Sequence, residues 1–299
     1  MWPEKPALGS AARGPAGLNG LLYYGVPMLF CLAVHWIALK TWFRADDFAW
    51  LGLRFEVHSP HDLLDVLLGP RAQGTIRTIS ERLYFLGFSS IFGMAAWPLR
   101  LWAFLTQFAN IALLIGITRR ITGSALAGLI APILWSAAAI LAIPLNWSSA
   151  YNEICFAFFT LLAFYFLLRA IETGKSKYCI AQWVVFLLGF GALELNVMYP
   201  VLATGYALCC ARAYLRRTLF LFIPSALFTA YHFLYIPPST DPQYAMYFDA
   251  GILRSLWTHW SFTLAASRPD RVDWRPVWLG IALTIAGALA AGRAASRDG

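Results

Sequence analysis

Long apolar segments recur along the whole chain and are separated by short polar turns. The first runs from 21 to 39 and the last from 277 to 291. Each approaches the ~20 residues with which a helix crosses a bilayer. The predicted spans are 21–41, 99–118, 123–143, 152–170, 178–194, 197–214, 218–236 and 276–292. We therefore expect an all-α, polytopic transmembrane bundle with about eight crossings.

The composition of the chain supports this prediction. Hydrophobic residues make up 60% of the sequence, charged residues only 13%, and the mean hydropathy is +0.61. No stretch is left over for a separate soluble domain. The first apolar segment follows a Gly/Ala/Pro-rich stretch with Glu4 instead of a short basic region and a cleavage site. We expect this segment to be a retained helix and the mature chain to begin near Met1.

The positions of the basic residues predict an orientation. A net charge of +8 would suggest nucleic acid in a soluble domain, but here Lys and Arg gather in alternate turns between apolar segments. The turns around 142–152 and 194–196 contain neither. By the positive-inside rule, the basic turns are cytoplasmic, both chain ends lie inside, and no nucleic-acid partner is expected. The basic residues are Arg119, Arg120, Arg169, Lys175, Lys177, Arg212, Arg216, Arg217, Arg293 and Arg297.

One apolar segment does not fit this orientation as a span. Residues 83–97 are apolar but number only about 15 and contain Gly and Ser. If they crossed the membrane, the basic turns would no longer agree with a cytoplasmic N-terminus. We predict an interfacial or re-entrant helix instead.

Two long outer loops divide the chain. Residues 1–20 form an inner tail, and 21–236 form the membrane core with outer loop 42–98. Residues 237–275 form a second outer loop with an aromatic-rich interfacial helix, and 276–299 form the last span and an inner tail. Loops of this length in a compact protein are usually functional.

The first outer loop contains two predicted juxtamembrane helices. Ser59 is a typical N-cap, Pro60 suits the first helical position, and Asp62 completes a capping box. Residues 46–55 carry apolar side chains at helical spacing and predict a second helix on the membrane surface.

The acidic pair Asp46 and Asp47 follows the first predicted span directly. Ionisable residues at a membrane are costly and usually functional. A low-dielectric edge raises the affinity of a carboxylate for protons, which suits a general base. Two simpler interpretations stay open. The pair could cap the helix that starts there, or hold a divalent ion, although such an ion usually needs further carboxylates.

Other polar residues are predicted on the same membrane face. Three arginines, together with acids, an amide, a tyrosine and a histidine from three outer turns, are expected to form a polar chamber on an apolar scaffold. The arginines could instead bind lipid headgroups, Glu153 could serve helix electrostatics, and His232 could be an interfacial hydrogen-bonding residue. The candidates are Arg44, Arg77, Arg82, Tyr151, Asn152, Glu153, Glu194 and His232.

The order of these parts resembles the GT-C-type polytopic glycosyltransferases, in particular the protein O-mannosyltransferase-like branch and its bacterial relatives. The similarity extends over roughly residues 20–220. It rests on the acidic pair, an Arg-led segment, a helical Asn, a Trp-Ser turn and a Glu with Pro six residues on. In this sequence these are Asp46 with Asp47, Arg77, Asn110, residues 147–153, and Glu194 with Pro200.

The resemblance implies transfer of a sugar from a polyprenyl or dolichyl phosphate to a hydroxyl of an acceptor protein or glycan. One aspartate would act as base, the reaction would invert the anomeric centre, and no cofactor would be needed. The three arginines would bind the phosphate, and Glu153 and Glu194 would orient acceptor hydroxyls or position those arginines. We expect a bacterial inner membrane location with the site facing the periplasm. The sequence departs from the family pattern at Thr78, Tyr151 and Leu193, where the family usually has Pro, Arg and Lys.

Two alternatives from other classes stay open. A transporter or flippase could use the same outer acids to bind a lipid-linked cargo without altering it, although the polar residues gather at one face and not at the bilayer midplane. A shortened, non-catalytic member could act with another membrane subunit, because related enzymes usually continue through more helices.

Overall fold

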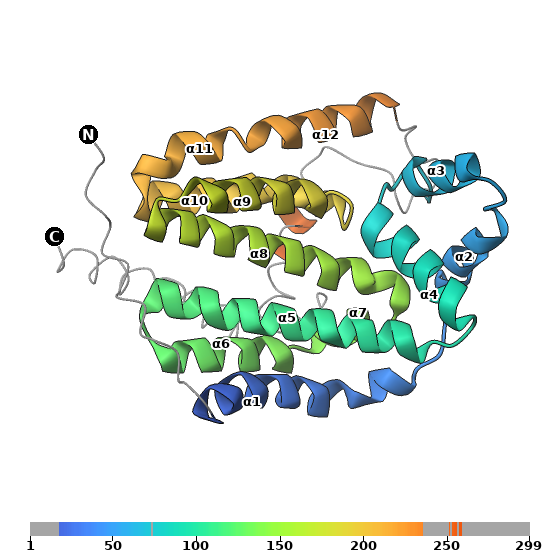
Figure 1. Ribbon diagram of the computed structural model, residues 1–299, viewed down its shortest axis with the longest axis horizontal. Coiled ribbons are helices and arrows are strands. Elements are labelled where there is room, and N and C mark those ends of the chain that lie inside the picture. The colour runs from blue at the N-terminus through green and yellow to red at the C-terminus, as the bar shows by residue number, and fades with distance from the viewer. Residues whose placement is uncertain (1–17, 73, 236–250, 252, 256, 259–299) are drawn as a thin grey trace. The chain divides into compact units, whose positions relative to one another are not determined.

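The computed structural model describes residues 18–72, 74–235, 251, 253–255 and 257–258. The chain divides into two units, Met1–Pro237 and Pro238–Gly299. The described part of the first unit is a bundle of helices (Figure 1), and its one β-bridge joins Arg71 and Thr75. The described residues of the second outer loop are helical. The predicted last span, 276–292, lies outside the described residues.

Four helical segments of the described chain are long and apolar enough to cross a membrane: Gly20–Lys40, Trp97–Thr122, Ser148–Thr173 and Arg212–Tyr235. A fifth candidate is a helix pair bent by 62° after Ala137. The elements are α1 (Leu18–His35) with η1 (Trp36–Lys40), α5 (Trp97–Thr122), α6 (Ala125–Ala137), η4 (Ala139–Leu141), α7 (Ala142–Asn146), η5 (Ser148–Ala150), α8 (Tyr151–Thr173), η7 (Arg212–Tyr214), α11 (Leu215–Leu219) and α12 (Phe222–Tyr235). The protein is therefore an integral membrane protein, and the regular elements of its described residues are all helices.

The helices found at the predicted spans 178–194 and 197–214 are shorter than those spans. They fold as α9 (Ser176–Gly189), of 14 residues, and α10 (Tyr199–Cys210), of 12 residues, with the 3-10 helix η6 (Glu194–Met198) before α10. A helix of 14 residues spans only about 21 Å at 1.5 Å per residue, less than the hydrocarbon core. The described chain thus supports four or five spans, and eight are not confirmed.

Local signals explain where the long helices stop. Gly123 and Gly174 follow α5 and α8 with φ of +68° and +67°, the left-handed conformation that ends helices and that glycine adopts without strain. Arg119 and Arg120 lie in the last turn of α5, where positive charge favours the helix dipole.

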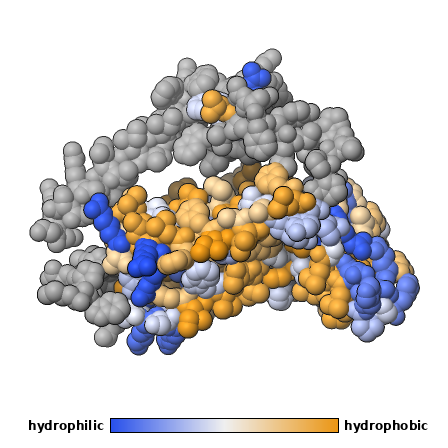
Figure 2. All heavy atoms as spheres, turned by 90° about the horizontal axis from the view of Figure 1, so that it is seen from above, coloured by the Kyte–Doolittle hydropathy of each residue, from blue (hydrophilic) through white to orange (hydrophobic). Residues whose placement is uncertain are grey.

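The helices pack as neighbours in space and leave much apolar surface exposed. Helix α8 lies between α5 and α9, α5 contacts α6, and α6 contacts α1. Less than half of each candidate span is buried inside the protein. Figure 2 shows the resulting apolar surface between hydrophilic ends of the described bundle. Such exposure is stable only against lipid, because it far exceeds what soluble proteins tolerate.

Short helices from residues 42–98, the predicted first outer loop, gather at one end of the bundle (Figure 1). The prediction at Ser59 is confirmed, because its Oγ accepts a hydrogen bond from Asp62 N at 3.2 Å. The Asp62 carboxylate in turn accepts from His58 N at 3.0 Å, which lowers the pKa of Asp62. These elements are α2 (Asp47–Gly52), η2 (Leu53–Phe55), α3 (Pro60–Leu68), the π-helical turn η3 (Thr78–Leu83) and α4 (Tyr84–Phe92).

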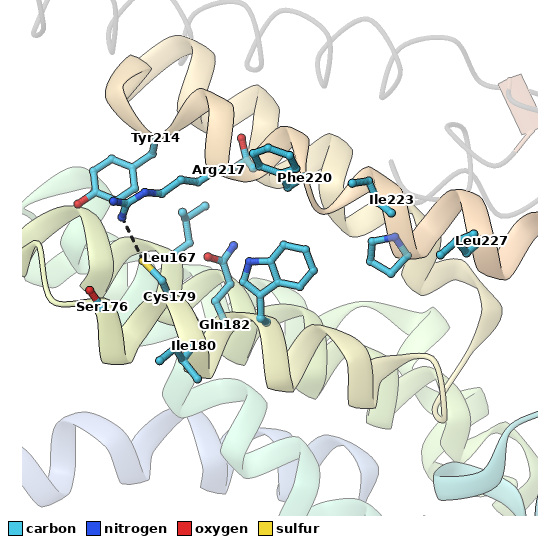
Figure 3. A pocket seen from close by; sticks show the side chains of 13 residues that line it. Leu167, Ser176, Cys179, Ile180, Gln182, Tyr214, Arg217, Phe220, Ile223 and Leu227 are labelled. Carbon is cyan, nitrogen blue, oxygen red and sulfur yellow. Dashed lines mark hydrogen bonds between the residues drawn. The ribbon is translucent and has the colours of Figure 1, made fainter.

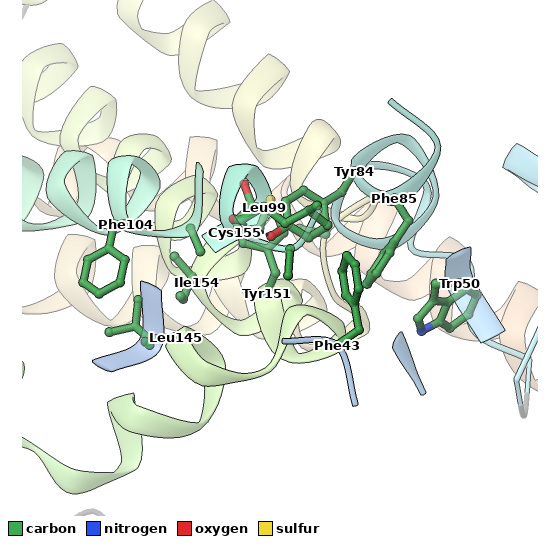
Figure 4. Packing of buried hydrophobic residues seen from close by; sticks show 14 of the residues in the cluster. Phe43, Trp50, Tyr84, Phe85, Leu99, Phe104, Leu145, Tyr151, Ile154 and Cys155 are labelled. Carbon is green, nitrogen blue, oxygen red and sulfur yellow. Dashed lines mark hydrogen bonds between the residues drawn. The ribbon is translucent and has the colours of Figure 1, made fainter. Parts of the chain in front are cut away.

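Helix α4 is too short to cross the membrane, as predicted for residues 83–97. It ends at Phe92, and Gly93 follows with φ +62°. Buried aromatic side chains attach this region to the bundle: Phe85 of α4 lies near Phe43 and Trp50, and Tyr84 lies near Leu99 of α5 (Figure 4). The Tyr84 hydroxyl donates to Leu99 O at 2.7 Å. The outer-loop helices are therefore part of the folded core.

Candidate functional site

Asp47 anchors the first outer loop to the bundle. One carboxylate oxygen, Oδ1, accepts hydrogen bonds from the backbone N and the Oγ of Ser149 at 2.7 and 2.6 Å. The other, Oδ2, accepts from Arg44 N at 3.1 Å and lies 3.8 Å from Nη2 of Arg100. The Asp47 side chain is fully buried. Its oxygens are thus engaged in holding the loop and are not accessible to a substrate.

Arg100, which the sequence reading did not single out, completes this anchor. Its side chain is 1% exposed, and it donates to the carbonyls of Thr41 and Trp42 at 3.4 and 3.1 Å. A buried charge pair persists only when such hydrogen bonds compensate for lost hydration. The sequence feature that could have indicated this role is a single arginine within the apolar stretch at the start of α5.

Asp46 has a different environment from its neighbour. It is exposed, and its side chain makes no capping hydrogen bond, although it occupies the N-cap position of α2. The preceding residue, Ala45, has φ +46°, a conformation that costs energy for a residue with a Cβ. Such strain at functional sites is held by the surrounding structure. Here the hydrogen bonds of Asp47 hold it, and the Asp46 carboxylate stays open to solvent.

A second polar group is centred on Arg77, and we call it the Arg77 cluster: Arg77, Glu81, Asn152 and Glu194. Arg77 donates from Nη1 to Glu81 at 2.7 Å and from Nε to Glu194 at 2.8 Å. Asn152 Nδ2 donates to Glu81 at 3.2 Å. One oxygen each of Glu81 and Glu194 is buried without a hydrogen-bond partner among the described residues. The cluster therefore keeps two acceptor atoms unused.

Glu81 was missed by the sequence reading, although it lies four residues after Arg77 on one helical turn. It is 2% exposed. Burial raises the pKa of its carboxyl group, and the Arg77 guanidinium opposes this shift. A buried acid with a raised pKa beside a charged partner is typical of functional sites. The i,i+4 spacing to an arginine was the signal available in the sequence.

The π-helical turn η3 brings Arg77 and Glu194 together across 117 residues of sequence. Both Ile79 N and Ser80 N donate to Gly191 O, at 2.8 and 3.3 Å, and Ser80 Oγ donates to Ala192 O at 2.6 Å. These bonds fasten η3 to the turn that leads into Glu194. π-Helical turns are rare and occur frequently at functional sites.

Residues 147–152, which include η5 and the first residues of α8, contact both the Asp46–Asp47 pair and the Arg77 cluster. Ser149 binds Asp47, and Asn152 binds Glu81. The Arg44 guanidinium lies 5.3 Å from the ring centroid of Trp147. The Asp46–Asp47 pair and the Arg77 cluster thus both bond to residues of this short segment.

An apolar cavity of about 440 Å³ borders the Arg77 cluster. Tyr151, next to Asn152, stacks on Tyr84 with ring centroids 4.1 Å apart, and its hydroxyl group accepts a hydrogen bond from Trp102 Nε1 at 2.9 Å. Figure 4 shows Tyr84 and Tyr151 side by side. The cavity is lined by Ile79, Leu83, Tyr84, Phe88, Trp102, Leu105, Thr106, Ala109, Tyr151, Cys155, Phe158 and Phe159.

Three other predicted residues are not members of these groups, although Arg82 directly follows Glu81 in η3. Arg82 is fully buried and donates to Leu67 O and Thr75 O at 2.8 and 2.6 Å. Asn110 is fully buried and donates to Ile154 O at 3.0 Å. These hydrogen bonds hold both buried side chains in the fold. His232 is half-buried on α12, with its ring near Phe233.

The remaining predicted residues stay accessible. Glu153 and Arg44 are exposed, and the side chains of Arg77 and Glu194 are 22% and 26% exposed. Within the described ranges, no three His, Cys, Asp or Glu side chains gather closely enough to hold a metal ion. The accessible groups among the predicted residues are therefore two exposed carboxylates, Asp46 and Glu153, one exposed arginine, Arg44, and the rim of the Arg77 cluster.

A helical membrane bundle with acids and arginines at one end fits the GT-C class of membrane glycosyltransferases. The family model described as dolichyl-phosphate-mannose-protein mannosyltransferase matches residues 83–238, more than half of the chain. The chain belongs to this family, and the resemblance seen in the sequence is confirmed. No curated protein and no solved structure matches. The match includes the 147–152 turn and Glu194 and leaves out Asp46 and Arg77.

Proposed function

We propose that this glycosyltransferase moves a sugar from a polyprenyl-phosphate carrier to an acceptor hydroxyl at the outer membrane face, with Asp46 as general base. The observation that carries the proposal is the contrast within the acidic pair. Asp47 is fully buried and bonded to Ser149 and Arg100, whereas Asp46 is exposed beside it. A general base must reach the proton that it removes. Within the pair, Asp46 meets this requirement and Asp47 does not.

The reaction needs one base because phosphate is a good leaving group. The acceptor oxygen attacks the anomeric carbon, and its proton passes to the Asp46 carboxylate. The bond from that carbon to the phosphate oxygen breaks, and its electrons leave with the phosphate. Attack opposite to the leaving group inverts the anomeric centre. The hydrogen bonds of Asp47 fix this turn and so hold the neighbouring base in place before the acceptor binds, which lowers the cost of orientation.

Arg44 is the candidate that neutralises the departing phosphate. Its side chain is exposed, rests on Trp147, and makes no ion pair with a carboxylate among the described residues. A guanidinium can hold phosphate with two hydrogen bonds. Arg77 is less available to bind phosphate, because its guanidinium already forms ion pairs with Glu81 and Glu194.

The Arg77 cluster is the candidate site for sugar or acceptor hydroxyls. Glu194 is partly exposed, and its Oε1 has no hydrogen-bond partner in the described part of the chain. Carboxylate oxygens accept hydrogen bonds from hydroxyl groups, and a buried oxygen without a partner is costly until a ligand supplies one. Arg77 would fix the position of Glu194. Glu153, which follows Asn152 in the first turn of α8, is exposed and could bind a further hydroxyl group.

The aromatic cavity beside the cluster suits the apolar chain of the carrier. Its volume of about 440 Å³ and its lining of Phe, Tyr, Trp and Leu side chains favour an isoprenoid segment. Ile79 lines the cavity and lies between Arg77 and Glu81 in η3. A lipid chain held there would bring its phosphate towards the polar groups.

The test compares the wild type with Asp46→Asn and with Asp65→Asn, an exposed aspartate on α3 that serves as the control. Each protein is reconstituted with labelled polyprenyl-phosphate sugar and with membrane extract as the source of acceptors. Mass spectrometry then follows bound donor and released polyprenyl phosphate. We expect Asp46→Asn to bind the donor and to release at least 100-fold less carrier, since general bases contribute about 10²–10⁴. The control should match the wild type.

Two outcomes would contradict the proposal. Full turnover by Asp46→Asn would remove Asp46 as the base. Passage of intact donor across the membrane, without consumption in any variant, would favour a flippase.

A further inference from the structure

A second groove of about 550 Å³ lies at the other end of the bundle, between α9 and the segment formed by α11 and α12 (Figure 3). It is separate from the Asp46–Asp47 pair and the Arg77 cluster and shares no lining residue with the aromatic cavity. Its lining includes Cys179, Ile180, Trp183, Arg217, Ile223 and Leu227.

The groove has one polar end and one apolar end. Figure 3 shows Arg217 and Tyr214 towards one end and Ile223 and Leu227 towards the other. The Arg217 guanidinium lies 5.3 Å from the Tyr214 ring centroid, and its Nη1 is 3.5 Å from the Cys179 sulfur. No lining residue is Asp or Glu. The charge of the groove is therefore positive and confined to one end.

The charge of Arg217 is not neutralised within the described protein. Two nearby arginines at this end of the bundle, Arg120 and Arg169, each contact a carboxylate oxygen of Glu172 at 3.1 Å. Arg217 makes no such pair with any described residue. Its only polar partner there is the Cys179 sulfur, a weak acceptor. A stronger acceptor from a ligand would replace this contact readily.

We propose that this groove binds an anionic phospholipid from the leaflet at the basic end of the bundle. The lipid phosphate would contact Arg217, and an acyl chain would lie along Trp183, Ile223 and Leu227. Basic pockets between transmembrane helices on the positively charged side are suited to anionic headgroups. The order of charge and apolar wall along the groove matches the order of headgroup and chain in one lipid. This inference does not depend on sugar transfer.

The test uses the full chain in detergent after lipid removal. Native mass spectrometry measures its affinity for phosphatidylglycerol and for phosphatidylcholine with the same acyl chains. We expect the wild type to prefer phosphatidylglycerol, and Arg217→Gln to lose about five- to tenfold of that affinity, in line with one basic residue at a membrane surface. The matched control is Arg212→Gln, because Arg212 is exposed nearby, bonds only Leu208 O among described residues, and does not line the groove.

Equal losses in the two arginine variants would overturn the proposal, because they would show diffuse attraction by the basic surface. Equal affinity of the wild type for both lipids would also overturn it. So would displacement of the lipid by millimolar inorganic phosphate, which would indicate a site for a free anion.

A second variant tests the apolar wall without changing charge. Leu227→Trp fills the groove at the end away from Arg217 and should lower phosphatidylglycerol affinity while the thermal midpoint and monodispersity stay those of the wild type. Unchanged affinity in a folded Leu227→Trp protein would show that the acyl chain does not occupy the groove, and would overturn the assignment.

Discussion

The carboxylate of Asp47 accepts two hydrogen bonds from Ser149, which lies 102 residues further along the chain. Its neighbour Asp46 stays exposed on the same turn. Two identical and adjacent side chains thus have opposite environments. One fixes the outer loop against the start of α8, and the other is left for chemistry in our proposal.

We expect Asp47→Asn to destabilise the protein by about 3–5 kcal/mol, because it leaves the buried Arg100 charge without its counter-ion. Asp46→Asn should change the free energy of unfolding by no more than about 0.5 kcal/mol, since it alters an exposed group. Denaturant unfolding in detergent, followed by circular dichroism, measures both. Ser149→Ala is the intermediate control and should cost about 1 kcal/mol, because it removes one hydrogen bond and keeps the backbone donor. A loss in Asp46→Asn as large as that in Asp47→Asn would refute this division of roles.

We expect Arg77→Lys to lower sugar transfer about tenfold or more even though it keeps the positive charge. Arg77 reaches Glu81 and Glu194 with two different nitrogens of one planar group, which an ammonium cannot reproduce. The assay is turnover of labelled donor. Arg71→Lys is the matched control, since Arg71 pairs with Glu56 at a more exposed position. Equal activity of both variants would show that the geometry around Arg77 does not matter.

Glu81 should give the protein a defined pH dependence. Burial raises the pKa of its carboxyl group above the ordinary value of 4.5. Between that value and the raised one, the folded protein holds a proton that the unfolded chain has lost. Its contribution to the free energy of unfolding is therefore present at low pH and falls as the pH rises through this window.

The measurement for Glu81 is thermal stability from pH 4 upwards for the wild type and Glu81→Gln. The wild type should lose stability relative to Glu81→Gln as the pH rises, and the difference curve isolates this one group. A difference that stays constant with pH would mean that the Glu81 pKa is the same in the folded and unfolded states.

Gly189 should not tolerate a larger residue. A Cβ added there would lie 2.5 Å from Oδ1 of Asn196, whose Nδ2 donates to Phe186 O. We expect Gly189→Ala to cost about 1–3 kcal/mol through overpacking and to weaken the turn that carries Glu194. Gly87→Ala is the control, because a Cβ at Gly87 meets no heavy atom within 4 Å. Comparison of their thermal midpoints tests the prediction, and equal midpoints would contradict it.

The features that depend on short-range patterns could be predicted from the amino-acid sequence. Apolar runs predicted helical segments of a membrane bundle, and four or five of the described ones are long enough to cross. The capping residues predicted the start of α3 at Ser59, which is confirmed. The resemblance predicted the family, which is shown by the match over 83–238. Each of these rests on hydrophobic periodicity, capping or residue order, and none needs a distant contact.

Which of the candidate site residues are accessible depends on long-range packing, and the sequence did not predict it. The burial of Asp47 depends on Ser149 and Arg100, and the Arg77 cluster forms because η3 bonds to the turn at Gly191. Nothing in the local sequence distinguishes Asp46 from Asp47. Their environments differ because partners far along the chain bury one carboxylate and supply its hydrogen bonds, and such long-range pairing is set by packing and not by local pattern.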